Sequence, residues 1–213
     1  MIKTLALIKR RPDLDRAAFR AHYEDVHVPL ALPLLTGLIR YVRHHVVANL
    51  HGGFDFDVLT CFGYSDKAAA NRVFALLESE QGEAIREDER RFMDKDANRF
   101  FAVSERVLVD GEEGGRHLFV LVARPSTLSR HDASQALGLT HWPRLLAEIG
   151  DLEFALLRDG FPVQGGELPY DAVLQIGCRG VAGLERWSKG LEAEGFQVTA
   201  VETQRFETAL PVG

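Results

Sequence analysis

The sequence predicts an α+β fold made of two β-α-β-β-α-β units whose sheets pair into a barrel. Three observations lead to this prediction: the length of the chain, a set of landmarks that recurs in its second half, and a polar, glycine-rich stretch between the two sets. The chain has 213 residues, of which 46% are hydrophobic and 26% are charged. This length fits one medium domain or two small ones, and the composition is that of a globular chain with a packed core.

The landmarks are an Arg-Pro pair after an apolar run, a His-x-Pro motif, and an Asp at a strand-like segment. The Arg-Pro pair occurs as Arg11-Pro12 and again as Arg124-Pro125. The His-x-Pro motif occurs as His27-Val28-Pro29 and again as His141-Trp142-Pro143, and the Asp occurs as Asp57 and again as Asp171. The members of the first pair are 113 residues apart and those of the other two are 114 apart, which we interpret as one inserted residue. Recurrence at a fixed spacing is the sequence signature of a repeated structural unit.

We therefore expect a first unit over residues 1–109, a linker over residues 110–115 and a second unit over residues 116–213. The linker, DGEEGG, is polar and has no apolar periodicity. The order of elements in each unit is the split β-α-β pattern of ferredoxin-like folds. A sheet backed by helices leaves its other face uncovered, so two such sheets in one chain can bury these faces against each other.

The first unit opens with an apolar run over residues 2–9, which has the length of a strand. Asp15 supplies an N-cap oxygen for the helix that follows. From 3.6-residue spacing, the apolar side of this helix is predicted to contain Phe19, Tyr23, Val26 and Leu30. Pro29 lacks a backbone N–H and is expected to bend or stop the helix about one turn after His27.

The rest of the first unit alternates strand-like runs and capped helices. Gly37 opens a strand over residues 37–47, which is rich in β-branched residues, and residues 56–62 form the next strand. Asp66 caps a helix that Gly82 interrupts. A second helical stretch follows over residues 83–98, and residues 100–109 close the unit as a strand.

The second unit keeps this order but lacks a counterpart of residues 83–98. Its predicted strands cover residues 118–123, 152–157, 172–176 and 198–205, and its predicted helices follow Ser129 and cover residues 181–194. The first unit alone has Tyr41, His45 and the helix of Asp88, whereas the second has Phe154, Arg158 or Asp159 and no helix at the corresponding places. We therefore expect function to be concentrated in the first unit, and we do not expect the second unit to contain the larger cavity.

Charge and composition argue against several classes of partner. Asp and Glu outnumber Lys and Arg by 31 to 25, a formal net charge of −6, whereas nucleic acids are bound by basic surfaces. The sequence has no run of about 18 apolar residues, so no membrane span is predicted. Cys61 and Cys178 each lie in an apolar segment, as in a reduced cytoplasmic protein with two core thiols, and the sequence leaves open one disulfide between them.

His27 is the main candidate for proton chemistry. At 100° per residue it lies at the edge of the apolar side of its helix, one turn after Tyr23, where an imidazole can reach a cavity. Because an imidazole titrates near neutral pH, His27 could act as a general acid or base. The alternative is a histidine at a helix end that hydrogen-bonds a backbone carbonyl near Pro29.

Strand 37–47 contributes further candidates. Its alternation places Tyr41 and His45 on one face, from which both could line the pocket of His27. An edge strand with solvated polar side chains is the alternative, above all for Arg43 and His44. Since His44 and His45 point to opposite faces of the strand, no histidine spacing in this segment is diagnostic of a metal site, and no bound metal is expected.

Asp88 falls with Ile85 and Phe92 on one side of the second helical stretch. A carboxylate among apolar groups needs a proton or a partner. Asp88 is thus a candidate proton carrier or partner of a histidine, and a salt bridge to an arginine is the ordinary alternative. The sequence contains no GxGxxG, GxxxxGK[ST], CxxC, HExxH or GxSxG motif, so nucleotide, zinc and acyl-enzyme chemistry have no local support.

Five segments resemble the EthD family of the dimeric α/β-barrel superfamily, across almost all of residues 1–109. They read LIKRRPDLDRAAFRAHYEDVHVPLA, GLIRYVRHHVV, FDVLTCFGYSD, SEQGEAIREDERRFMD and RFFAVSERV. The specific elements are the Arg-Arg-Pro opening, His27 with Pro29, Gly37 with Tyr41, Asp57, Asp88 and Glu89 with Phe92, and the closing strand. The second unit resembles the family only faintly, through His141, Pro143, Tyr170 and Asp171. We therefore interpret it as a degenerate tandem copy.

The resemblance implies a pocket between sheet and helices, and chemistry on ethers, other xenobiotics or polyketide-type aromatics without a cofactor. We expect a cytoplasmic enzyme that performs a dehydratase or lyase type of proton transfer on a small hydrophobic, aromatic or cyclic oxygenated molecule. His27 and Asp88 would be catalytic, and Tyr23, Tyr41, His45 and Phe92 would bind substrate. The alternatives are a non-catalytic binding or accessory protein and a cofactor-free monooxygenase. The resemblance also leaves open a homodimer.

Overall fold

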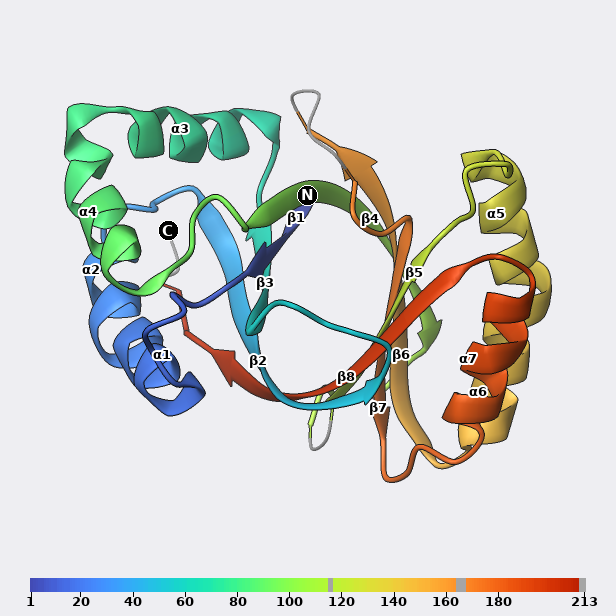
Figure 1. Cartoon of the computed structure of the whole chain (residues 1–213). Helices are drawn as coiled ribbons and strands as arrows, with labels where there is room; N and C mark the ends of the chain where they lie inside the picture. The colour runs from blue at the N-terminus through green and yellow to red at the C-terminus, as the bar shows by residue number, and fades with distance from the viewer. Residues whose placement is uncertain (115–116, 164–167, 211–213) are drawn as a thin grey trace. The chain divides into compact units, whose positions relative to one another are not determined.

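The computed structural model describes residues 1–114, 117–163 and 168–210 (Figure 1). The chain divides into two compact units. Unit 1 comprises residues 1–45, residues 55–102 and the chain from Arg205 onward, and unit 2 comprises residues 46–54 and 103–204. Of the predicted linker, residues 110–114 contain neither helix nor strand. Residue 115 of that linker lies outside the described residues, as do residues 116, 164–167 and 211–213 of the predicted second unit.

Unit 1 contains the elements predicted for the first half of the chain. Its strands are β1 (Ile2–Ile8), the first part of β2 (Leu38–His51), β3 (Val58–Tyr64) and the start of β4 (Arg99–Val109). Its helices are α1 (Arg16–His22), α2 (Val28–Ala31), α3 (Lys67–Glu78) and α4 (Glu83–Phe92), with a π-helical segment, Tyr23–His27, between α1 and α2. Strand β3 pairs antiparallel with both β1 and β2. The side chains of Asp15 and Asp66 cap α1 and α3 as predicted.

Unit 2 repeats this order with one helix fewer. Its strands include β5 (His117–Ala123), β6 (Leu152–Pro162), β7 (Ala172–Cys178) and most of β8 (Gln197–Glu207). Its helices are α5 (Arg130–Ala136), α6 (Trp142–Ile149) and α7 (Leu184–Ala193), with a π-helical segment, Leu137–His141, between α5 and α6. Strand β5 pairs antiparallel with β7 and β8, and β6 pairs antiparallel with β7.

The eight strands follow the hydrogen-bonded order β1-β3-β2-β8-β5-β7-β6-β4 of a closed barrel. The predicted α+β fold, with two ferredoxin-like β-α-β-β-α-β units and paired sheets, is confirmed. Each unit has its own cluster of buried apolar side chains beneath its helices. Cys61 and Cys178 are both buried and form no disulfide. None of the helices in the described ranges is long and apolar enough to cross a membrane.

The π-helical segment overturns one detail of the helix prediction. Val26 and Leu30, predicted to face the core, are 46% and 37% exposed, whereas His27 and Ala31 are buried. The cause is an extra residue in the turn, because the N–H of Val28 donates to the carbonyl of Tyr23, five residues earlier. The wider turn rotates all later side chains about the helix axis. His27 therefore lies fully inside unit 1 rather than at the edge of the apolar side.

Pro29 is followed by the end of the helix at Ala31, about one turn after His27, as expected. It lies in the first turn of α2, which continues to Ala31. A proline is tolerated in that turn because its missing N–H is not needed there. The second unit has the same arrangement, with Pro143 in the first turn of α6 and a π-type bond from the N–H of Trp142 to the carbonyl of Leu137.

The inferred one-residue insertion is also wrong, because the two units match at a single offset of 114. Asp57 accepts hydrogen bonds from the backbone N–H of Arg10 at 3.0 Å and from its Nε at 3.2 Å. Asp171 accepts the same pair from Arg124 at 2.9 and 3.3 Å. The residue equivalent to Arg124 is thus Arg10, not Arg11, and the Arg-Pro pairs matched in sequence are shifted by one position in the structure.

Candidate functional site

Unit 1 contains a cavity of about 210 Å³ between its sheet and its helices. Helices α1 to α4 lie on one face of this sheet (Figure 1). The polar side chains that line the cavity are Tyr23, His27, Tyr41, Tyr64, Glu89, Asn98 and Arg99. The rest of the wall is apolar and includes Ile8, Leu35, Phe62, Phe74, Leu77 and Phe100. Its lining, mostly apolar with a few polar groups, is typical of a small-molecule site, and its volume lies below the range of about 300–1,000 Å³ in which drug-sized ligands bind.

His27 and Asp88 meet at the wall of this cavity. The Nδ1 atom of His27 lies 2.9 Å from Oδ2 of Asp88, and Nε2 of His22 lies 2.9 Å from Oδ1 of the same carboxylate. Asp88 is 2% exposed, whereas the side chain of His22 is 25% exposed. The three side chains form a chain of hydrogen bonds that leads from the cavity to solvent.

Burial lowers the pKa of His27 from its ordinary value of 6.5, and the hydrogen bond to Asp88 opposes this shift only in part. The imidazole is therefore neutral at pH 7 and carries one proton. A carboxylate can only accept, so this proton is on Nδ1, which donates to Asp88. Nε2 is left with its lone pair and can act as a base.

Tyr23 and Tyr41 supply hydroxyl groups to the same cavity. Burial raises the pKa of Tyr23 to about 12, and the hydroxyl lies 3.0 Å from Oγ1 of Thr60. Burial also raises the pKa of Tyr41 well above its ordinary value. Both hydroxyls therefore stay protonated. A hydrogen bond joins them to each other, so the pair has one hydroxyl proton left to donate to a substrate oxygen.

His45 does not line this cavity. It is buried behind Tyr23, with ring centroids 5.6 Å apart, and its Nε2 lies 2.7 Å from Oε1 of Glu24. Glu24 also pairs with Arg43, whose guanidinium lies over the ring of Tyr41 at 4.5 Å. His45 and Arg43 are thus part of a buried ion cluster beneath the two tyrosines. The solvated edge strand, the alternative for Arg43 and His44, does not occur, because both side chains are buried.

Phe92 is a packing residue behind the site. It is fully buried, and its ring lies 4.6 Å from that of His22, 5.1 Å from that of His27 and 5.5 Å from that of Tyr23. One turn separates it from Asp88 on α4, so one face of this helix brings both the carboxylate and the supporting ring to the histidines.

Sequence reasoning missed His22 and Glu24. In a regular α-helix, residues five apart differ by 140° in direction, so His22 and His27 would not be expected to contact one carboxylate. The π-helical segment brings them together. The recurring His-x-Pro motif was the only sequence feature that marked this segment, and it does not by itself predict a π turn.

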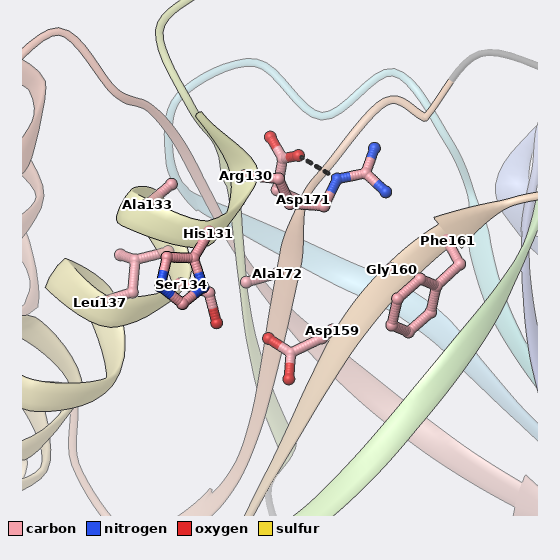
Figure 2. A pocket seen from close by; sticks show the side chains of 10 residues that line it. All are labelled: Arg130, His131, Ala133, Ser134, Leu137, Asp159, Gly160, Phe161, Asp171 and Ala172. Atoms are coloured by element: carbon pink, nitrogen blue, oxygen red, sulfur yellow. Dashed lines mark ion pairs between the residues drawn. The ribbon is translucent and has the colours of Figure 1, made fainter. Parts of the chain in front are cut away.

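Unit 2 contains a second cavity, of about 320 Å³. Figure 2 shows the residues around it: Arg130, His131, Ala133, Ser134, Leu137, Asp159, Gly160, Phe161, Asp171 and Ala172. This cavity is larger than that of unit 1, so the expectation about cavity size is wrong. Among its described residues, unit 2 has no counterpart of α4. The region that this helix and its neighbouring side chains fill in unit 1 is therefore open in unit 2. In the described part of the chain, no three His, Cys, Asp or Glu side chains are arranged to hold a metal ion.

Comparisons with solved structures identify the fold. An anthrone oxidase-like protein is 11% identical, with a TM-score of 0.63 and 100% of this chain and 95% of that chain covered. A candidate monooxygenase from Fusobacterium nucleatum is 7% identical, with a TM-score of 0.57 and coverage of 98% and 94%. A mutant chlorite dismutase from Candidatus Nitrospira defluvii is 11% identical, with a TM-score of 0.51 and coverage of 95% and 91%. At these identities the likeness concerns the fold alone.

A comparison with family models gives a match in the first half of the chain. No curated protein matches the sequence. The model of the EthD domain matches residues 11–96, the range that contains the two histidines, Asp88 and the three tyrosines of the cavity. Within this chain, similarity to the EthD domain is thus found over residues 11–96.

Proposed function

We propose that unit 1 is a cofactor-independent enzyme of the dehydratase or lyase type, acting on a small aromatic or cyclic oxygenated molecule. The observation that carries this proposal is the neutral imidazole of His27, held by Asp88 with Nε2 available as a base, in a mostly apolar cavity that also offers two tyrosine hydroxyls. A base and hydrogen-bond donors placed around one substrate are the parts that proton abstraction next to a carbonyl requires.

The proposed reaction removes water from a β-hydroxy carbonyl compound. Nε2 of His27 accepts a proton from the carbon next to the carbonyl, and the C–H electron pair forms an enolate. The hydrogen-bonded pair of Tyr41 and Tyr23 donates one hydrogen bond to the enolate oxygen. The enolate then expels the β-hydroxyl group, which takes the proton from the imidazolium and leaves as water. Asp88 stabilises the imidazolium while it exists.

The cavity size indicates the size of the substrate. A cavity of about 150 Å³ lined by apolar side chains is known to hold benzene, so one of about 210 Å³ accommodates a single substituted ring. The aromatic side chains Phe62, Phe74 and Phe100 on its wall favour a flat substrate.

A turnover assay tests the proposal against both alternatives. Single-ring β-hydroxy carbonyl compounds are incubated with the protein, and dehydrated product, dissolved oxygen and ligand binding are measured together. The proposal predicts product without oxygen uptake. Oxygen uptake that depends on substrate would support a monooxygenase instead, and binding without any product would support a binding or accessory protein.

The activity is expected to depend on pH through His27. Because burial lowers the pKa of this imidazole, kcat/KM should be constant at neutral pH and fall only when the pH drops below 6.5, as His27 takes up a proton. Asp88→Asn should move this fall to a still lower pH, because the hydrogen bond to Asp88 raises the pKa of His27. Profiles of kcat/KM for both proteins measure this; an unchanged profile in Asp88→Asn would contradict the assignment of the base.

A further inference from the structure

The cavity of unit 2 lies where aromatic and charged side chains fill unit 1. Equivalent positions are set by strand register: His45 pairs with Val58 in unit 1, and Asp159 pairs with Ala172 in unit 2. His45 and Asp159 are therefore equivalent, at the same offset of 114 that relates the two π-helical segments. By this offset the residues equivalent to Phe19 and Glu24 are Ala133 and Gly138.

In unit 1 these positions form a packed group. The ring of Phe19 lies 6.1 Å from the imidazole of His45, edge to face, and 5.6 Å from the ring of Phe92 on α4. His45 in turn pairs with Glu24. Unit 1 thus holds an aromatic ring and a nitrogen group paired with a carboxylate in a space that its own side chains fill.

In unit 2 the ring and the nitrogen group are missing, but a carboxylate is present. Ala133 replaces the ring, unit 2 has no counterpart of α4, and Asp159 replaces the imidazole. Figure 2 shows Asp159 pointing from β6 into the space that faces Ala133 on α5. One of its oxygens pairs with Arg106 at 3.1 Å, and the other makes no hydrogen bond to any residue that the structure describes.

Asp171 and Arg130, two other charged side chains of this cavity, are already paired; the imidazole of His131 also lines it. Asp171 accepts hydrogen bonds from Arg124 and pairs with Arg130 at 3.6 Å, the contact drawn in Figure 2. The ring of Phe161 is 44% exposed at the edge of the cavity. Asp159 is therefore the acceptor that a ligand can use, and the wall around it is largely apolar.

We propose that the cavity of unit 2 is a binding site for a small aromatic amine. The ring of the ligand occupies the space that Phe19 fills in unit 1, between Ala133 and Phe161, and its protonated nitrogen donates to the unpaired oxygen of Asp159. The volume of about 320 Å³ falls at the lower end of the range for small-molecule sites, which begins at about 300 Å³. This site is separate from the proposed reaction and does not depend on it.

Binding of benzylamine to the full chain tests this proposal, with benzyl alcohol as the uncharged control of the same shape. The structure predicts that benzylamine binds at least about 10-fold more tightly than benzyl alcohol, because a charge-assisted hydrogen bond to a carboxylate is stronger than a neutral one. Titration calorimetry measures the affinities, and chemical-shift changes at residues of α5 and β6 locate the site.

Three variants separate the contributions. Asp159→Asn should weaken benzylamine binding by about 10-fold or more and leave benzyl alcohol unchanged. Arg106→Gln removes the competing partner of Asp159 and should strengthen benzylamine binding. Ala133→Phe restores the ring of unit 1 and should abolish binding of both compounds.

The variants also keep the proposal falsifiable. Asp159 and Arg106 have partly exposed side chains, so their variants should fold even if Ala133→Phe does not. Equal binding of benzylamine and benzyl alcohol, or an Asp159→Asn protein that binds benzylamine as the parent does, would overturn the proposal. The same conclusion follows if a folded Ala133→Phe protein retains benzylamine binding, since the ligand would then occupy another site.

Discussion

Replacement of His27 by Ala is expected to lower kcat/KM by about 10²- to 10⁴-fold, the contribution typical of a general acid or base. The reason is the loss of Nε2 from the cavity wall, which leaves the tyrosine hydroxyls and the apolar surface in place. Because His27 is buried and hydrogen-bonded to Asp88, the Ala variant should also lose stability. Activity and unfolding must therefore be measured on the same variants.

Two substitutions separate the chemical role from the structural one. In His27→Asn the amide N–H can replace Nδ1–H as the donor to Asp88, but no base faces the cavity, so activity should fall as in the Ala variant while stability is largely kept. His22→Gln retains a donor to Asp88 outside the cavity and should lose far less activity. If His27→Asn remains fully active, His27 acts only in the structure, and the binding-protein alternative gains support.

Replacement of Asp57 by Ala is expected to destabilise the protein by about 2–4 kcal/mol. The 7% exposed carboxylate accepts three hydrogen bonds, from the backbone and Nε of Arg10 and from Nε of Arg16 at 3.1 Å. Removing one partner of a fully buried ion pair costs about 3–5 kcal/mol. The two arginine side chains keep part of their contact with water, which reduces the cost.

Asp171→Ala is the matched change in unit 2. Asp171 makes the same contacts, but its side chain is 14% exposed and its distance to Nε of Arg130 is 3.6 Å, so a smaller loss is expected. Urea unfolding of both variants and the parent measures the difference. A loss below about 1 kcal/mol for Asp57→Ala would show that solvent replaces the carboxylate, and that this network does not fix the start of α1.

Periodicity and recurrence predicted most of the fold, because strands, caps and the order of elements depend on local sequence. Asp15 and Asp66 cap their helices, and Asp88 and Phe92 share one buried face of α4. The direction of side chains after Tyr23 was not predictable from regular helix geometry. A single additional residue in the turn changes which residues face inward, and Val26 and His27 exchange the roles that a 3.6-residue period assigns to them.

The cavity of unit 2 was missed for a different reason. The sequence shows that residues equivalent to α4 are absent from unit 2, and this absence by itself predicts loss of a site. In the structure, removal of a helix together with replacement of Phe19 by Ala133 leaves space. Whether such a deletion produces a collapsed core or an open cavity depends on how far the neighbouring elements can move, which a sequence pattern does not show.

The π-helical segment has a consequence for sequence variation in unit 1. Contact between His27 and Asp88 depends on the number of residues between Tyr23 and Pro29 as much as on their identity. Deletion of one residue there would leave every proposed catalytic side chain in the sequence but turn His27 out of reach of the carboxylate. Homologues that conserve both residues but differ by one residue in the length of this turn would thus lack the paired site. The length of the turn should therefore separate functional subgroups better than the identity of the two residues.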